Sequence, residues 1–262
     1  MAEDRCPRAN SVAAEPTAGA LCWLPIESLN TRYASLRPGS PCSVPQDIGE
    51  LPLRVVPTAE GRYELIDGFK RLRLWQQRGV KNISVVVEQP SAPEQQKRLL
   101  LAANCPPRTL TALDEGRVVY SLQQEDKLSP SAISRLLGRK PQWVAKRLQI
   151  ATRLSDAAQL AVARGRIGPT LAHALCALPD GQQDALLSSI HTNDLKLREA
   201  LALLSAYRLA DEAERRTLLK SPLGWVRSEP ANPATSAVTA ECERRLQEIR
   251  SPSKPGRLCH SP

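Results

Sequence analysis

The stretch from Leu128 to Ala151 constrains the fold of this chain more than any other, because it carries the signals of two short helices separated by a tight turn. Ser129 is a good N-terminal cap, and Pro130 follows at the first helical position, where a missing N–H is tolerated. Apolar residues at positions 133, 136 and 137 form one stripe. Gly138 is suited to end the first helix, and Pro141 to start the second.

This pattern is typical of a helix-turn-helix, whose second helix enters the major groove of DNA. Lysine and arginine suit guanine edges and phosphates, and glutamine suits adenine. We therefore predict DNA contacts from seven residues of the stretch, which are Ser129, Ser131, Lys140, Gln142, Trp143, Lys146 and Arg147. For this stretch alone, an ordinary pair of antiparallel helices with a solvated basic face is the alternative.

The composition favours helices and a polyanionic partner. Only 3% of the residues are aromatic, so the core must be built from aliphatic side chains, and the formal net charge is +9. No two of the seven cysteines have Cys-x-x-Cys spacing, and the three histidines do not complete a set of metal ligands. We expect reduced thiols, no secretory signal and no membrane span.

Strand-like segments occur only in the first part of the chain. Apolar runs at 21–29, 51–56, 62–66 and 83–88 predict strands, with a loop at 30–50. Apart from a helix at 69–75, the helical stripes lie at 93–103 and beyond, and the last of them, at 195–204, is expected to run on toward residue 219. The prediction is an α+β chain with a small mixed-sheet domain at 21–108 and an all-helical DNA-binding domain at 109–220. Disordered segments are expected at 1–20 and, as a basic and proline-rich tail, at 221–262.

The strand-turn-helix at Tyr63–Trp75 is the best candidate for a ligand site. Gly68 permits a sharp backbone turn, and the helix after it offers free N–H groups and the positive end of its dipole. Lys70, Arg71 and Arg73 add cationic side chains. The segment therefore predicts a phosphate site, and a helix with a basic outer face is the plainer alternative.

A weaker candidate lies between two predicted helices, where Asn104 and Arg108 flank a pair of prolines. Asparagine can orient a phosphate or a metal-bound water, and arginine can clamp a phosphate with two hydrogen bonds. A simple linker between helices explains the same residues.

Five segments of the chain, in order, resemble those of the ParB-type chromosome and plasmid partition proteins. They are LPIESL at 24–29, GRYELIDGFKRLRLW at 61–75, AANCPPRTLTALDEG at 102–116, LSPSAISRLLGRKPQWVAKRLQIATRL at 128–154 and GRIGPTLAHALCALPDGQQ at 165–183. The resemblance covers roughly residues 21–205. No single motif is decisive, but five in the same order are hard to obtain by chance.

The resemblance implies a ParB/sulfiredoxin-like N-terminal domain followed by a helix-turn-helix domain that binds a centromere-like DNA site. In that family the N-terminal domain binds CTP with Mg²⁺ and acts as a clamp on DNA, and a ParA-type ATPase moves the complex. The resemblance implies that Gly68, Lys70 and Arg71 face the triphosphate. It implies the same nucleotide-binding role for Asn104, beside the phosphate or metal, and for Arg108.

The nucleotide motifs depart from the family's pattern. Phe69 stands where the family has glutamate and Lys70 where it has arginine, and lysine lacks the two-pronged geometry of a guanidinium. Ala103 replaces a second glutamate, and Arg108 stands one position late. Because the loss of a carboxylate weakens a Mg²⁺ site, we predict weak or lost CTP switching. A CTPase stays open, whereas sulfiredoxin activity is not expected, since no cysteine starts the helix after Gly68.

The family's C-terminal dimerisation domain has no clear counterpart in 221–262, where only 239–250 favours a helix. Self-association through other helices and a monomer off DNA are both open. We expect a cytoplasmic protein associated with a nucleoid or plasmid, bound to double-stranded DNA and not to membranes. A helix-turn-helix transcription regulator of a mobile element or plasmid, with no partition role, is the alternative.

Overall fold

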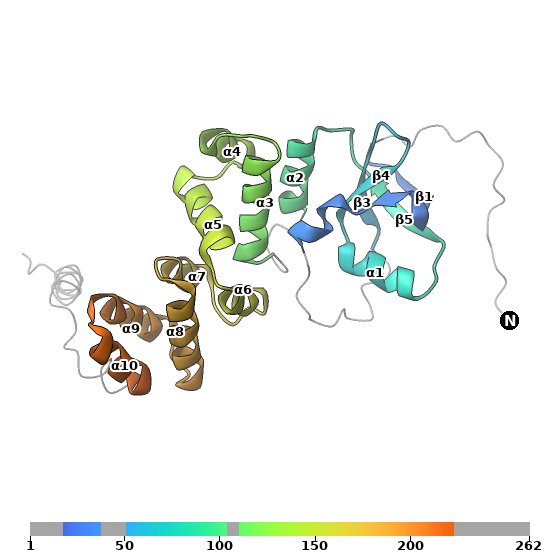
Figure 1. The fold of residues 1–262 in the computed structure, drawn as a ribbon. Helices are drawn as coiled ribbons and strands as arrows, with labels where there is room; N and C mark the ends of the chain where they lie inside the picture. Colours follow the sequence, from blue (N-terminus) through green and yellow to red (C-terminus); the bar gives the residue numbers. More distant parts are fainter. Residues whose placement is uncertain (1–17, 38–50, 104–109, 223–262) are drawn as a thin grey trace, which may run out of the picture. The chain divides into compact units, whose positions relative to one another are not determined.

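The computed structural model of the chain describes residues 18–37, 51–103 and 110–222. Within these residues, strands occur only before α2 (Pro93–Ala102) and the later elements are helices (Figure 1), which confirms the α+β prediction. The predicted disorder at 1–20 and 221–262 falls almost wholly outside the described residues, as does most of the predicted loop at 30–50.

Five strands form one mixed sheet in the order β1-β5-β3-β4-β2. They are β1 (Leu21–Pro25), β2 (Leu29–Asn30), β3 (Leu53–Pro57), β4 (Tyr63–Asp67) and β5 (Asn82–Val87). Antiparallel pairing joins β1 to β5 and β3 to β4, whereas β3 is parallel to β5 and β2 is parallel to β4. The predicted strands are confirmed, and β1 lies at one edge of the sheet, but the short β2 was not predicted as a separate strand.

The first helix, α1 (Phe69–Gln77), is held to the sheet by three large side chains. Phe69, Leu72 and Trp75 are buried at helical spacing. They share an apolar cluster with the inward-facing residues of β5, which alternate along the strand as Ile83, Val85 and Val87. This packing fixes the turn between β4 and α1, where Gly68 lies.

Two short 3₁₀ helices, η1 (Ile26–Ser28) and η2 (Arg32–Leu36), lie next to β2, and η2 falls inside the segment predicted as loop. Burial of Tyr33 stabilises η2, and the Tyr33 hydroxyl donates to Oε1 of Gln96 at 2.9 Å. The buried carboxylate of Glu64 accepts from the backbone N–H of Arg32 at 2.8 Å. These partners lie far along the chain, so local periodicity did not indicate the helix.

Helices follow the sheet, as the helical stripes at 93–103 and beyond predict. They are α2 (Pro93–Ala102), α3 (Ala112–Gln124), α4 (Pro130–Leu137), α5 (Pro141–Arg153), α6 (Asp156–Ala163) and α7 (Pro169–Leu175). The side-chain amide of Gln183 is wholly buried and holds two connections together. It donates to the carbonyls of Arg153 and Leu178 and accepts from the N–H of Ser155, and so joins the α5–α6 connection to the α7–α8 connection.

A single apolar core joins the sheet to the helix-turn-helix. One cluster of buried side chains contains Leu53 of the sheet, Leu100 of α2, Val118 of α3, Ile133 of α4 and Val144 of α5. Residues 1–184 accordingly form one compact unit and residues 185–262 a second. The predicted domain boundary near residue 108 stays a prediction, since the core continues from one side of it to the other.

The boundary between the two units falls within α8 (Asp180–Thr192), and the second unit also contains α9 (Leu197–Leu209) and α10 (Glu212–Lys220). The prediction of one stripe running on toward residue 219 is wrong, because the helix breaks at Ala210. Asp211 caps α10 by accepting from the N–H of Glu214 at 2.9 Å, and Glu214 accepts from the N–H of Asp211 at 2.8 Å. Among the described helices, none is both long and apolar enough to cross a bilayer.

Candidate functional site

The first helix of the predicted helix-turn-helix, α4, has the ends that its sequence indicates. The Ser129 hydroxyl accepts from the N–H of Ala132 at 3.2 Å, and Gly138 ends the helix with a left-handed φ of 62°. The turn is then held by the Ser134 hydroxyl, which donates to the carbonyl of Arg139 at 2.5 Å. These bonds set where α5 begins, and so fix the direction of the second helix.

The second helix, α5, presents one apolar and one polar face. Val144 and Ile150 are buried beneath it, whereas Lys140, Gln142 and Lys146 are exposed at its start and along its outer face. The predicted DNA-contacting residues of α4, Ser129 and Ser131, are exposed as well. Five of the seven predicted residues therefore lie where a ligand can reach them.

The sixth predicted residue, Trp143, is half-buried and lies under two guanidinium groups. Arg139 is 5.5 Å and Arg147 is 5.1 Å from the centroid of the ring. Cation–π contacts of this kind contribute about 0.5–2 kcal/mol each, depending on exposure. The tryptophan joins the turn before α5 to the third turn of the same helix.

The seventh predicted residue, Arg147, is engaged inside the protein. Its Nε donates to Oε2 of Glu115 on α3 at 2.5 Å, and the side chains are only 13% and 16% exposed, respectively. A base contact by Arg147 stays a prediction. The geometry instead favours a positioning role, in which the ion pair holds α5 against α3.

The crossing of α3 and α5 is close because α3 carries a glycine where the helices meet. A Cβ at Gly116 would lie 2.6 Å from the carbonyl oxygen of Arg147 and 3.1 Å from the Cβ of Ala151. Real Cβ atoms do not approach a carbonyl oxygen so closely, so the crossing requires glycine. This glycine, like Glu115, was not assigned a role from the sequence.

His173 of α7 lies close enough to α5 for the charges of Lys146 and Arg147 to affect its protonation. Burial lowers the pKa of the His173 imidazole, and the positive charges of Lys146 and Arg147 lower this pKa further. Nothing in the sequence indicated that α7 packs on α5. The basic face of α5 therefore extends toward α7.

The strand-turn-helix at Gly68 has the geometry that its sequence indicates. Gly68 has a φ of 102°, a conformation that other residues rarely adopt, and a Cβ there would overlap the side chain of Leu53. Among the described residues, no side chain caps the N-terminus of α1, and the first N–H groups of a helix attract anions. Lys70 is half-exposed in this first turn.

Arg71, predicted to face a phosphate, is buried and forms hydrogen bonds within the chain. Its Nη1 donates to the carbonyls of Leu51 and Pro52 at 2.5 and 2.8 Å, and its Nη2 donates to Oδ2 of Asp67 at 3.0 Å. The other carboxylate oxygen of Asp67 is 3.7 Å from Nη1 of Arg37. Burial lowers the pKa of both guanidinium groups, and Asp67 opposes this effect. A phosphate here would compete with Asp67 for both cations.

The remaining nucleotide-motif residues are placed only in part. Phe69, at the position where the family has glutamate, is buried in the core, which explains why an apolar residue is accepted there. Asn104 and Arg108 lie outside the described residues. In the described part of the chain, no group of three His, Cys, Asp or Glu side chains could hold a metal ion.

Comparison with known proteins agrees with this arrangement of helices. Residues 108–208, which contain α3 to α8 and most of α9, match the family model described as the ParB HTH domain. The chain is 29% identical over 164 residues to a probable chromosome-partitioning protein ParB of Pseudomonas putida, which covers 62% of this chain and 55% of the relative. The chain is therefore similar to the ParB-type partition proteins, above all in its helix-turn-helix domain. The resemblance that the sequence motifs indicated is thereby confirmed.

The chain is also similar to a second curated protein and to a solved structure. The chain is 28% identical over 166 residues to a nucleoid occlusion protein of Lysinibacillus sphaericus, covering 62% of this chain and 55% of that protein. It is also similar to the C-terminally truncated chromosome-partitioning protein ParB of Caulobacter crescentus complexed to the centromeric parS site. That similarity has 22% identity, a TM-score of 0.42, and coverage of 70% of this chain and 98% of the other. The chain thus spans about half the length of the curated ParB-type relatives that it matches.

Proposed function

We propose that this ParB-type chain binds a specific, centromere-like site on double-stranded DNA through α4 and α5, and so acts as the DNA-binding component of a partition system. One observation supports this most directly. The exposed side chains of Lys140, Gln142 and Lys146 lie on the outer face of α5, while its inner face is fixed to α3 by Gly116 and the Glu115 ion pair. A rigid helix with a free polar and basic face suits the major groove.

The exposed residues divide by chemistry into two roles. Ser129 and Ser131 lie at the N-terminus of α4, where hydroxyl and backbone N–H groups suit phosphate oxygens. Gln142 and Lys146 lie on the first two turns of α5, where an amide can pair with adenine and an ammonium group with guanine. Phosphate contacts would set the register of the protein, and base contacts would set its specificity.

Nucleotide binding at Gly68 is a weaker part of the same proposal. The turn and the uncapped N-terminus of α1 fit a phosphate, and Lys70 stands close by. Arg71 and Arg37 fit less well, because Asp67 already offsets their charge. We propose that CTP, with Mg²⁺ carried by its phosphates, binds weakly. In that case any CTPase activity is slow.

The proposed partners are a second copy of this chain and an ATPase, as expected for a ParB-type protein on a DNA site. A palindromic site has two half-sites and so binds two copies of the helix-turn-helix, which makes self-association on DNA part of the proposal. A ParA-type ATPase is the proposed partner for movement, and the proposed location is the nucleoid or a plasmid in the cytoplasm.

Mapping of bound DNA across the genome, with and without CTP, tests this function. A sharp site in wild type that disappears in Lys146→Glu supports specific reading by α5. Spreading from that site only with CTP supports a clamp, and a sharp site without spreading indicates a regulator or a partition protein without a switch. Uniform binding that is unchanged by Lys146→Glu overturns the proposal. Calorimetry of wild type and Lys70→Ala with CTP tests the nucleotide part separately.

A further inference from the structure

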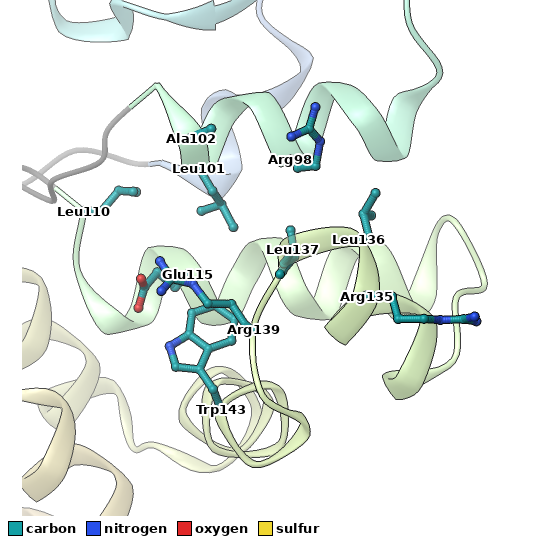
Figure 2. Close-up of a pocket in the computed structure, with 11 residues that line it drawn as sticks. Arg98, Leu101, Ala102, Leu110, Glu115, Arg135, Leu136, Leu137, Arg139 and Trp143 are labelled. Carbon is teal, nitrogen blue, oxygen red and sulfur yellow. The ribbon is translucent and has the colours of Figure 1, made fainter.

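A groove of about 400 Å³ lies between α2 and the helix-turn-helix pair (Figure 2). Five large apolar side chains line it, which are Leu101, Leu110, Leu136, Leu137 and Trp143. All five are only partly buried, although their neighbours Leu100 and Ile133 are wholly covered by the core. We refer to this surface as the α2–α4 groove.

The rim of the α2–α4 groove is strongly cationic. Arg98 lies on α2 on one wall, and Arg135 and Arg139 lie on α4 and the turn on the other. In Figure 2 the Arg98 and Arg135 side chains point outward from the leucines, at the edge of the groove. All three are exposed, and within 18–37, 51–103 and 110–222 none of them forms an ion pair. The groove's one carboxylate, Glu115, already pairs with Arg147.

Three exposed arginines at the edge of an apolar floor suit a ligand that carries both large apolar side chains and carboxylates. Carboxylates form charge-assisted, two-pronged hydrogen bonds with arginine, and the leucine floor supplies the area that apolar anchors bury. We propose that the α2–α4 groove docks a short acidic segment of a partner protein that carries one or two leucine-sized anchors. The proposal does not depend on DNA binding by α5.

Other ligand classes fit the groove less well. A nucleotide base would need a free aromatic face, but Arg139 and Arg147 already lie over the ring of Trp143. A DNA backbone would use the three cations and leave the leucine floor uncovered. A purely apolar small molecule would leave the rim charges unpaired. An acidic peptide with apolar anchors is the class that satisfies both the floor and the rim.

The test uses the full-length protein and a fluorescein-labelled synthetic peptide in which pairs of leucines alternate with pairs of glutamates. Its binding is measured by fluorescence anisotropy. We expect saturable binding that weakens as NaCl rises, because the rim charges are exposed to solvent. The double variant Arg98→Glu with Arg135→Glu should weaken binding at least about tenfold, since it turns attraction into repulsion on both walls.

Two controls separate the groove from general basic charge. Arg78→Glu reverses an exposed arginine at the end of α1, outside the groove, and should change the affinity less than about twofold. A peptide with glutamine in place of glutamate should bind much more weakly. Both substituted groove arginines are exposed, so the double variant should fold, and its thermal transition checks this.

Several results would overturn the proposal. They are no binding of the glutamate peptide up to millimolar concentration, equal binding of the glutamine peptide, and equal losses in the groove variant and Arg78→Glu. A fourth is a groove variant that binds the peptide normally but loses affinity for random duplex DNA. That result would assign the three arginines to the DNA backbone.

Discussion

The ammonium group of Lys97 on α2 lies 2.7 Å from the carboxylate of Asp126, just beyond the end of α3, and the lysine side chain is wholly buried. The same ammonium donates to Glu125 at 2.9 Å, and this hydrogen bond is the main cause of the lowered pKa of the Glu125 carboxyl. A buried lysine is tolerated only with such partners. The contact joins α2, which packs on the sheet, to the end of α3, which packs on α5.

Loss of Lys97 should therefore be strongly destabilising. In Lys97→Ala, the Asp126 carboxylate loses its partner, and removing one member of a buried pair costs about 3–5 kcal/mol. Urea unfolding followed by circular dichroism measures this loss. The double variant Lys97→Met with Asp126→Asn should recover part of it, because no charge is then left unpaired. A Lys97→Ala variant as stable as wild type would show that the ion pair contributes nothing.

Substitution at Lys146 should affect DNA binding without affecting the fold. Lys146 is exposed, and Lys146→Ala should weaken specific binding by about 1–3 kcal/mol if the ammonium group reads a base. The thermal midpoint should stay close to that of wild type. Binding to specific and random duplexes is compared at a fixed salt concentration. An equal loss on both duplexes would assign Lys146 to phosphate.

Arg147 and Glu115 should behave as one unit. Arg147→Ala and Glu115→Ala should each lower stability, and the double variant should lose much less than the sum, with a coupling of about 0.5–3 kcal/mol. The cycle is measured by unfolding and then by DNA affinity. If Arg147 positions α5, both single variants weaken DNA binding through the helix. If Arg147→Ala alone weakens it, Arg147 reads DNA directly.

The helix-turn-helix could be predicted from sequence because its signals are local. Ser129, Pro130 and Gly138 act within a few residues of themselves, so the helix ends followed from chemistry that is visible in the printed chain. Asp211 and Glu214 carry the same kind of local signal, a capping box, and the break between α9 and α10 could have been found from it. The break was missed because apolar residues continue at helical spacing on both sides of it.

The partners of the predicted site residues could not be found in the same way. Arg147 meets a glutamate that is separated from it by 32 positions, and Arg71 meets carbonyls that are separated from it by 19 and 20 positions. A basic residue on a helix looks the same in sequence whether it faces solvent or a buried carboxylate. Phe69, Tyr33 and Lys97 likewise owe their burial to segments that are distant in the chain.

Replacement of Gly116 reverses the usual effect of removing glycine from a helix. Gly→Ala normally stabilises a helix interior by about 0.5–1 kcal/mol. At Gly116 the new methyl group would meet the carbonyl of Arg147, so Gly116→Ala should instead destabilise by about 1–3 kcal/mol. Gly181→Ala on α8 is the matched control, since nothing lies within 4 Å of its Cβ position. Thermal unfolding of both variants measures the contrast, and equal midpoints would contradict the tight crossing.

His173 should make stability sensitive to mild acid. Its pKa in the folded protein lies below the ordinary value of 6.5, mainly because of burial, so the unfolded chain binds the proton more readily. The contribution is fully present above about pH 6.5 and is lost as pH falls from there through the lower pKa of the folded state. His173→Gln should flatten the decline in thermal midpoint between pH 7.5 and 5.5. An unchanged decline would show that other groups cause it.

The single core and the Lys97 ion pair also determine how this protein can be divided. A fragment that started at residue 109 would keep every residue of the helix-turn-helix. It would lack Lys97, the partner of Asp126, and Leu100, which belongs to the same buried cluster as Val118. Such a fragment would be expected to aggregate or to hold α5 loosely, and a weak DNA affinity measured with it would be misleading. The shortest fragment in which the DNA affinity of α5 can be measured reliably must begin before α2.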